Sequence, residues 1–137
     1  MLSTLLIVVH VAANLLWVGS IVSVGVVAGL PLSTPSLRGQ IALALYRRLA
    51  APSFGISFLS GLGRLSMNAR FYLWDTHYLQ AKLGAVFALI ALHHALGARV
   101  RRMATGAAEN AGHAPKAAAG VLVLASIAAF FALAKPF

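Results

Sequence analysis

Residues 3–30 read STLLIVVHVAANLLWVGSIVSVGVVAGL and contain no charged side chain. A helix that spans a bilayer needs about 20 consecutive, predominantly apolar residues, so this stretch is long enough to cross one. It has no basic start, and its apolar run is longer than the roughly 7 to 15 residues of a signal-peptide core. We therefore expect a permanent transmembrane helix rather than a cleaved targeting segment.

Three further apolar stretches follow, at residues 49–65, 76–98 and 116–134. The chain has 137 residues, of which 61% are hydrophobic and only 9% are charged, whereas soluble domains carry about 25% charged residues. So few charges would not solvate the surface of a soluble domain, but they suit a protein surrounded by lipid. The sequence therefore predicts an all-α fold: one domain over residues 1–137, an integral membrane bundle of four transmembrane helices.

The basic residues predict how these helices are oriented. Seven of them lie on one side, between the first and second stretches or between the third and fourth: Arg38, Arg47, Arg48, Arg99, Arg101, Arg102 and Lys116. Three lie on the other side: Arg64, Arg70 and Lys135. Because cytoplasmic loops are enriched in Lys and Arg, we expect the first group to face the cytoplasm and both termini to lie outside.

Charge and small residues indicate the partners. A net charge of +9 would suggest nucleic acid in a soluble protein. Here the cations lie mainly between apolar runs, so we expect contacts with anionic lipid headgroups and no nucleic-acid partner. Gly25 and Gly29 form a GxxxG pair, which lets helices approach closely in lipid. We expect that contact inside the bundle; a homo-oligomer or a larger membrane complex is the alternative.

Polar residues on the first helix are candidates for function. His10, Asn14 and Trp17 stand at i, i+4 and i+7, so they share one face. Histidine within hydrocarbon is costly and normally points into the bundle or a cavity. Two interpretations stay open for His10: a hydrogen-bonded structural residue, or a haem or metal ligand or proton carrier. Trp17 lies too deep for an interfacial residue and either packs or lines the same site.

The third helix carries a similar stripe. Lys82 and His93 lie on one face, about 16 Å apart at 1.5 Å per residue. Antiparallel packing places Lys82 at the depth of His10, so the two residues can line one cavity. A single haem, by contrast, is hard to ligate with both His10 and His93. Lys82 would snorkel to the interface, or act inside as a second haem ligand, a proton-handling group or the partner of an anion.

The second helix offers a third polar stripe at Ser53, Ser57, Ser60 and Arg64. These serines either bond back to their own helix or form a polar wall that faces the cavity of His10 and Lys82. Pro52, just before the stripe, should bend the helix or begin it, because its nitrogen has no hydrogen to donate.

Enzyme motifs are otherwise missing from the sequence. The chain has two carboxylates, Asp75 and Glu109, and both fall in expected loops. The sequence contains no pair of carboxylates on one helix face, no serine–histidine–acid triad and no glycine-rich phosphate-binding loop. With so few acid–base groups, any chemistry would have to come from a bound cofactor.

The order and spacing of several elements resemble the HemJ-type membrane protoporphyrinogen oxidases, within the wider group of CopD-like four-helix membrane proteins. The elements are His10, Trp17-Val18-Gly19, Tyr46-Arg47-Arg48-Leu49, Pro52, Gly61, Gln80-Ala81-Lys82-Leu83, His93, the basic run Gly97–Arg102 and Lys135-Pro136-Phe137. The resemblance implies a haem b with His10 as its axial ligand, a functional Lys82 and a location in a bacterial inner membrane.

The expected site follows from these observations together. His10 would be the metal ligand and Lys82 the catalytic residue, acting on a porphyrinogen substrate. The other cofactor-binding candidates are Asn14, Trp17, His93, Arg47 and Arg48. We expect the last two to join Arg99, Arg101 and Arg102 in one basic patch, which either contacts anionic lipid or attracts the propionates of a porphyrin, since the planar guanidinium suits carboxylates.

Two other functions remain open. A CopD-like protein would handle copper, but the chain has no cysteine and its methionines are scattered, so only imidazoles could serve as ligands. A non-catalytic subunit of a larger membrane complex is the second alternative. The chain departs from the family pattern at two places: no glutamate follows Asn110, and Leu92 stands where the family has a tyrosine.

Overall fold

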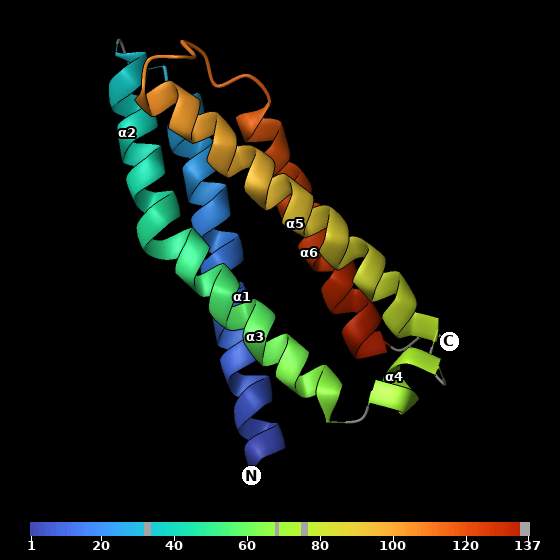
Figure 1. Cartoon of the computed structure of the whole chain (residues 1–137). Coiled ribbons are helices and arrows are strands. Elements are labelled where there is room, and N and C mark those ends of the chain that lie inside the picture. Colours follow the sequence, from blue (N-terminus) through green and yellow to red (C-terminus); the bar gives the residue numbers. More distant parts are fainter. Residues whose placement is uncertain (32–33, 68, 75–76, 135–137) are drawn as a thin grey trace.

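The computed structural model describes residues 1–31, 34–67, 69–74 and 77–134. Figure 1 shows a chain that is helical throughout these residues apart from short connections, and they contain no strand. The elements are α1 (Leu2–Gly29), α2 (Pro35–Leu45), the π-helical segment η1 (Tyr46–Ala50), α3 (Ala51–Ser66), α4 (Ala69–Trp74), α5 (His77–Ala104) and α6 (Ala114–Ala134). The all-α prediction is therefore confirmed. Asp75 and Lys135–Phe137, which entered the sequence argument, lie outside the described residues.

Three helices are long and apolar enough to cross a membrane. They are Leu2–Gly29, Leu79–Ala104 and Ala114–Ala134. Within the most apolar window of each, only 22%, 28% and 17% of the residues are buried inside the protein. A soluble protein would not expose that much continuous apolar surface to water. The chain is therefore a membrane protein with at least these three candidate spans among its described residues.

The chain between α1 and α3 differs from expectation. The sequence suggested a connecting loop up to about residue 48, but α2, η1 and α3 form one continuous helical run. Arg38, Arg47 and Arg48 consequently lie on helix surfaces. In the same way α5 continues through Arg99, Arg101 and Arg102, which were expected in a loop. Basic side chains are good helix formers, so their presence marks the end of an apolar stretch but not the end of a helix.

The π-helical turn has a cause in the sequence. In a regular α-helix the ring of Pro52 would collide with the carbonyl group of Arg48, and its nitrogen has no hydrogen to donate. A wider turn relieves that collision, and the Ala51 N–H indeed bonds to the Tyr46 carbonyl, five residues back. Figure 1 shows the long helix bending here, between α2 and α3. Of the two expectations for Pro52, that it bends the helix or that it begins it, the structure shows the bend (Figure 1), because the helical run continues on both sides of this residue.

The helices pair differently at the two ends of the bundle. α1 packs against α2 and η1 near its C-terminal end and against α3 nearer its N-terminal end, while α5 packs along α6 and α2. Figure 1 shows the pair α1–α3 diverging from the pair α5–α6 toward the end that holds the N-terminus and α4. The basic C-terminal part of α5 lies at the opposite, closely packed end.

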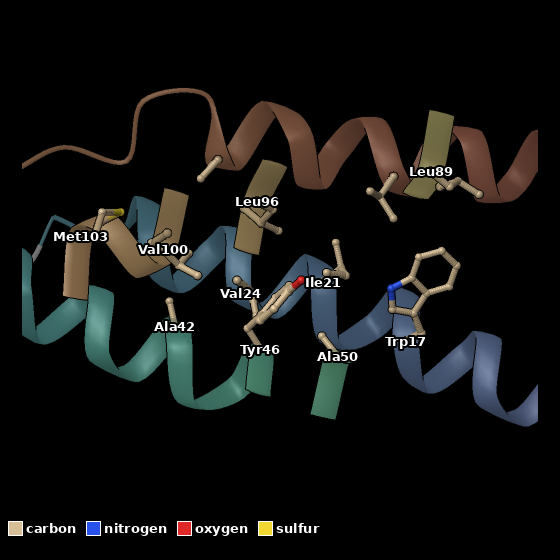
Figure 2. Packing of buried hydrophobic residues seen from close by; sticks show 13 residues of the cluster. Trp17, Ile21, Val24, Ala42, Tyr46, Ala50, Leu89, Leu96, Val100 and Met103 are labelled. Atoms are coloured by element: carbon tan, nitrogen blue, oxygen red, sulfur yellow. The ribbon is translucent and has the colours of Figure 1, made fainter. Parts of the chain in front are cut away.

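Small residues allow the close packing. A Cβ atom placed on Gly25 would collide with the Ala118 side chain of α6, and one on Gly29 would lie 3.0 Å from the Pro115 ring. The GxxxG pair therefore faces α6 of the same chain, as expected for a contact inside the bundle. Figure 2 shows the core beside this crossing as a row of buried side chains from α1, α2, η1 and α5, with Trp17 at one end and Met103 at the other.

Candidate functional site

His10 lies on the face of α1 that meets α3. Its Nδ1 atom is 2.8 Å from the Ser57 carbonyl oxygen and 3.3 Å from the Ser60 hydroxyl. A carbonyl oxygen can only accept, so Nδ1 carries the hydrogen and Nε2 of the neutral ring keeps its lone pair. No described residue hydrogen-bonds to Nε2. His10 therefore has the orientation of a metal-ligating histidine, held by one nitrogen and able to coordinate through the other.

The surface of α3 is shaped to receive this ring. A Cβ atom on Gly61 would lie 2.8 Å from His10 Cε1, so only glycine leaves the imidazole its space. Ser60 donates to the Ile56 carbonyl at 2.6 Å, and Ser53 donates to the Leu49 carbonyl at 2.5 Å. The serines thus bond back to their own helix, and Ser60 in addition presents its oxygen to His10. Bonding back to the helix is confirmed for Ser53 and Ser60, whereas the polar wall facing a cavity shared with Lys82 stays a prediction.

Cations lie near His10 on the diverging side of the bundle. Lys82, half-buried on α5, is within electrostatic range of the His10 ring. Arg64, at the end of α3, donates to the Ser3 hydroxyl at 2.6 Å. No described carboxylate pairs with Lys82, since Glu109 lies beyond the far end of α5. A half-buried ammonium that has no carboxylate partner among the described residues and lies within electrostatic range of a histidine favours an anionic ligand there.

Asn14 shares the His10 face but does not touch the ring. Its side-chain nitrogen donates to the His10 backbone carbonyl at 2.8 Å, one turn back on α1. This bond occupies one of its two amide hydrogens. The amide oxygen has no bond of its own within the described residues, so Asn14 stays a candidate for a contact with a cofactor.

His93 belongs to a separate, closed cluster. It is 1% exposed, and its ring stacks on Phe54 with centroids 4.6 Å apart. The Trp17 indole N–H donates to Nδ1 at 3.1 Å. Because the indole can only donate, the hydrogen of the neutral imidazole must be on Nε2, which then donates to the Tyr46 hydroxyl at 3.0 Å. Both ring nitrogens are occupied by protein groups.

The predicted site residues on α1 and α5 are therefore divided between two places. His10 and Asn14, with Lys82 nearby, form the group that has an open nitrogen. Trp17 and His93 join α1 to α5 beside η1 and α3. In this arrangement His93 offers no nitrogen to a metal, and its expected role in cofactor binding stays a prediction.

Tyr46 and Phe54 complete the histidine cluster, and sequence reasoning did not select them for it. One signal was present: Gly97 follows His93 by four residues, on the same face of α5. A Cβ atom there would collide with the Tyr46 ring. A glycine one turn beyond a buried histidine thus indicated a bulky partner, but not which residue supplied it.

Arg47 and Arg48 are exposed on η1. The adjacent residue Tyr46 is within electrostatic range of Arg101, so the two arginine groups occupy neighbouring parts of the bundle, where α2 packs against α5. That both groups form one basic patch stays a prediction.

The open His10 nitrogen is not part of a larger cluster of metal-ligating side chains. Among the described residues, no group of three or more His, Cys, Asp or Glu side chains could hold a metal ion.

No family model, curated protein or solved structure matches this chain.

Proposed function

We propose that this chain is a haem-binding membrane oxidoreductase, similar to the HemJ-type protoporphyrinogen oxidases. The observation that carries the proposal is the state of His10: Nδ1 is hydrogen-bonded to the Ser57 carbonyl at 2.8 Å, while Nε2 has no partner among the residues that the structure describes. Gly61 opposite the ring supports it, because a larger residue would displace the imidazole. The ligand would be a haem b, which His10 would hold through Nε2.

A bound haem supplies one-electron redox chemistry, which the side chains of this protein lack. Lys82 would act beside it in one of two ways. As a cation it pairs with a propionate; as a neutral amine it accepts protons from the substrate or ligates the iron. The reaction is the six-electron oxidation of a porphyrinogen, with the electrons passing to an acceptor in the membrane. Arg47 and Arg48 would attract the carboxylates of the substrate.

The membrane arrangement is part of the same proposal. The run α2–η1–α3 crosses the bilayer as a fourth transmembrane helix through its α3 part, supported by the exposed apolar side chains Ile56, Phe58, Leu59 and Leu62. The basic end of the bundle faces the cytoplasm and contacts anionic lipid, and both termini face the periplasm of a bacterial inner membrane.

An absorption spectrum of the purified protein tests the cofactor. We expect a Soret band and, after reduction, the bands of a b-type haem. A protein that carries copper and no haem would indicate the copper-handling alternative. A protein that carries neither after expression with ample haem would indicate a non-catalytic subunit. If haem is present, the rate of protoporphyrinogen oxidation tests the substrate. We expect this rate to exceed the rate without protein, and we expect Lys82→Met to be inactive.

A further inference from the structure

Two arginines hold the loop between α5 and α6. Arg38, in the first turns of α2, donates to the carbonyl groups of Leu30 and, at 3.2 Å, of Glu109. Arg99, near the end of α5, donates to the Asn110 carbonyl at 2.7 Å and to the Asn110 side-chain oxygen. Because Glu109 and Asn110 are adjacent in the chain, the two guanidinium groups bind the same short stretch of the loop at the closely packed end of the bundle.

These guanidinium groups are incompletely satisfied. The Nε atoms of Arg38 and Arg99 are buried without a hydrogen-bond partner, and within the described residues they are the only side-chain atoms in that condition. A guanidinium has five N–H donors, and the loop oxygens take only some of them. Buried donors of this kind are normally paired with water, an ion or a ligand.

Their charge is also uncompensated. Neither arginine forms an ion pair among the described residues, and Glu109 offers Arg38 its backbone carbonyl rather than its carboxylate. Exposed Arg101, Arg102 and Lys116 add further positive charge at this end. Two neighbouring, partly buried cations repel each other unless an anion lies beside them.

We infer that Arg38 and Arg99 form a binding site for a phosphate group. Phosphate oxygens accept from guanidinium N–H groups in pairs, and one phosphate can neutralise two neighbouring arginines. The phosphate comes either from the headgroup of a lipid or from free phosphate. The site does not depend on the haem proposal, since it lies at the opposite end of the bundle from His10.

Gly112 supplies a second feature of this site. Its φ angle is +54°, and a Cβ atom there would lie 2.9 Å from Arg99 Nη2 and 3.1 Å from Arg99 Nε. A side chain at this position would displace the guanidinium. Gly106, in the same loop, has φ +74° and nothing within 4 Å of such a Cβ atom. Gly112→Ala and Gly106→Ala therefore introduce similar backbone strain, but only the first disturbs Arg99.

The first test compares phosphate binding between matched variants of the full chain in detergent. Inorganic phosphate should raise the unfolding temperature of the wild type more than sodium chloride at equal ionic strength. Arg99→Lys keeps the charge but loses the planar fork, so we expect binding weakened about tenfold. Arg101→Lys, on the same helix, should bind like the wild type. Gly112→Ala should weaken binding and Gly106→Ala should not.

The second test identifies the source of the phosphate. Native mass spectrometry compares retention of phosphatidylglycerol with that of diacylglycerol, which lacks the phosphate, on wild type and Arg99→Lys. If the wild type retains phosphatidylglycerol, Arg99→Lys retains less of it, and inorganic phosphate does not stabilise the protein, the phosphate comes from a lipid headgroup. Stabilisation by inorganic phosphate that Arg99→Lys reduces identifies a site for free phosphate. If neither probe binds the wild type, or if Arg99→Lys and Arg101→Lys behave alike, the inference is wrong.

Discussion

At the scale of single residues, hydrogen-bond direction separates His10 from His93. A carbonyl oxygen faces His10 Nδ1, so its other nitrogen is open. An indole N–H faces His93 Nδ1 and a phenol faces Nε2, so neither of its nitrogens is open. The residue type is the same in both cases, and only the partners on other helices distinguish a histidine with one open nitrogen from a histidine whose two nitrogens are both bonded.

Gly61→Ala should weaken haem binding while leaving the fold intact. The added methyl group would lie 2.8 Å from His10 Cε1 and push the ring away from its Ser57 partner. Gly55→Ala is the matched control on α3, because nothing lies within 4 Å of its Cβ position. The measurement is the haem-to-protein ratio after purification. Equal ratios in the two variants would show that Gly61 does not shape the site.

Trp17→Phe should destabilise the bundle by about 1–2 kcal/mol, because it removes the donor to a buried histidine nitrogen. Trp74→Phe serves as control, since Trp74 is 77% exposed and distant from the core. Chemical unfolding followed by circular dichroism in detergent measures the difference. If both variants unfold like the wild type, the Trp17–His93 bond contributes nothing to stability.

Residue-level prediction from the sequence succeeded for faces and failed for partners. Helical periodicity placed His10 and Asn14 on one face, and the structure keeps them there. The cluster of His93 with Tyr46 and Phe54 was missed, because it depends on how far one helix slides along another. That register is determined by packing at positions such as Gly97, which lies against Tyr46. A single sequence shows that Gly97 allows a close contact, but not with which residue.

At the scale of helices, length and polarity predicted α1, α5 and α6 within a few residues at most ends. The largest differences concern basic segments. Residues 35–48 and 99–104 were expected outside the helices, because their charges interrupt the apolar stretches. Hydropathy predicts where lipid contact ends, whereas a helix continues until its backbone hydrogen bonds are interrupted.

Gly25→Ala should pull α1 and α6 apart. The methyl group would collide with Ala118, and overpacking of this kind costs about 1–3 kcal/mol. At Gly19, on the same helix, a Cβ atom meets nothing within 4 Å, and alanine there should be neutral or stabilising because it favours the helix. The unfolding temperature of Gly25→Ala should therefore fall, whereas that of Gly19→Ala should stay the same or rise. Equal shifts would contradict the α1–α6 crossing.

At the scale of the whole molecule, the proposed fourth span decides which side of the membrane each end of a helix faces. The chain contains no cysteine, so single cysteines can be placed freely at the exposed positions Leu2, Met67 and Ala107. With four spans, a membrane-impermeant maleimide should label Leu2→Cys and Met67→Cys in intact cells, and Ala107→Cys only after permeabilisation. Labelling of Met67→Cys only after permeabilisation would show that α3 does not cross the bilayer.

The haem content of His10→Ala, measured beside His94→Ala, tests the central claim most directly. Both histidines lie in apolar helices, but His94 is exposed whereas His10 is held by Ser57. We expect His94→Ala to keep the b-type spectrum of the wild type, and His10→Ala to insert into the membrane yet carry no haem. Full haem occupancy in His10→Ala would contradict the assignment of His10 as the axial ligand.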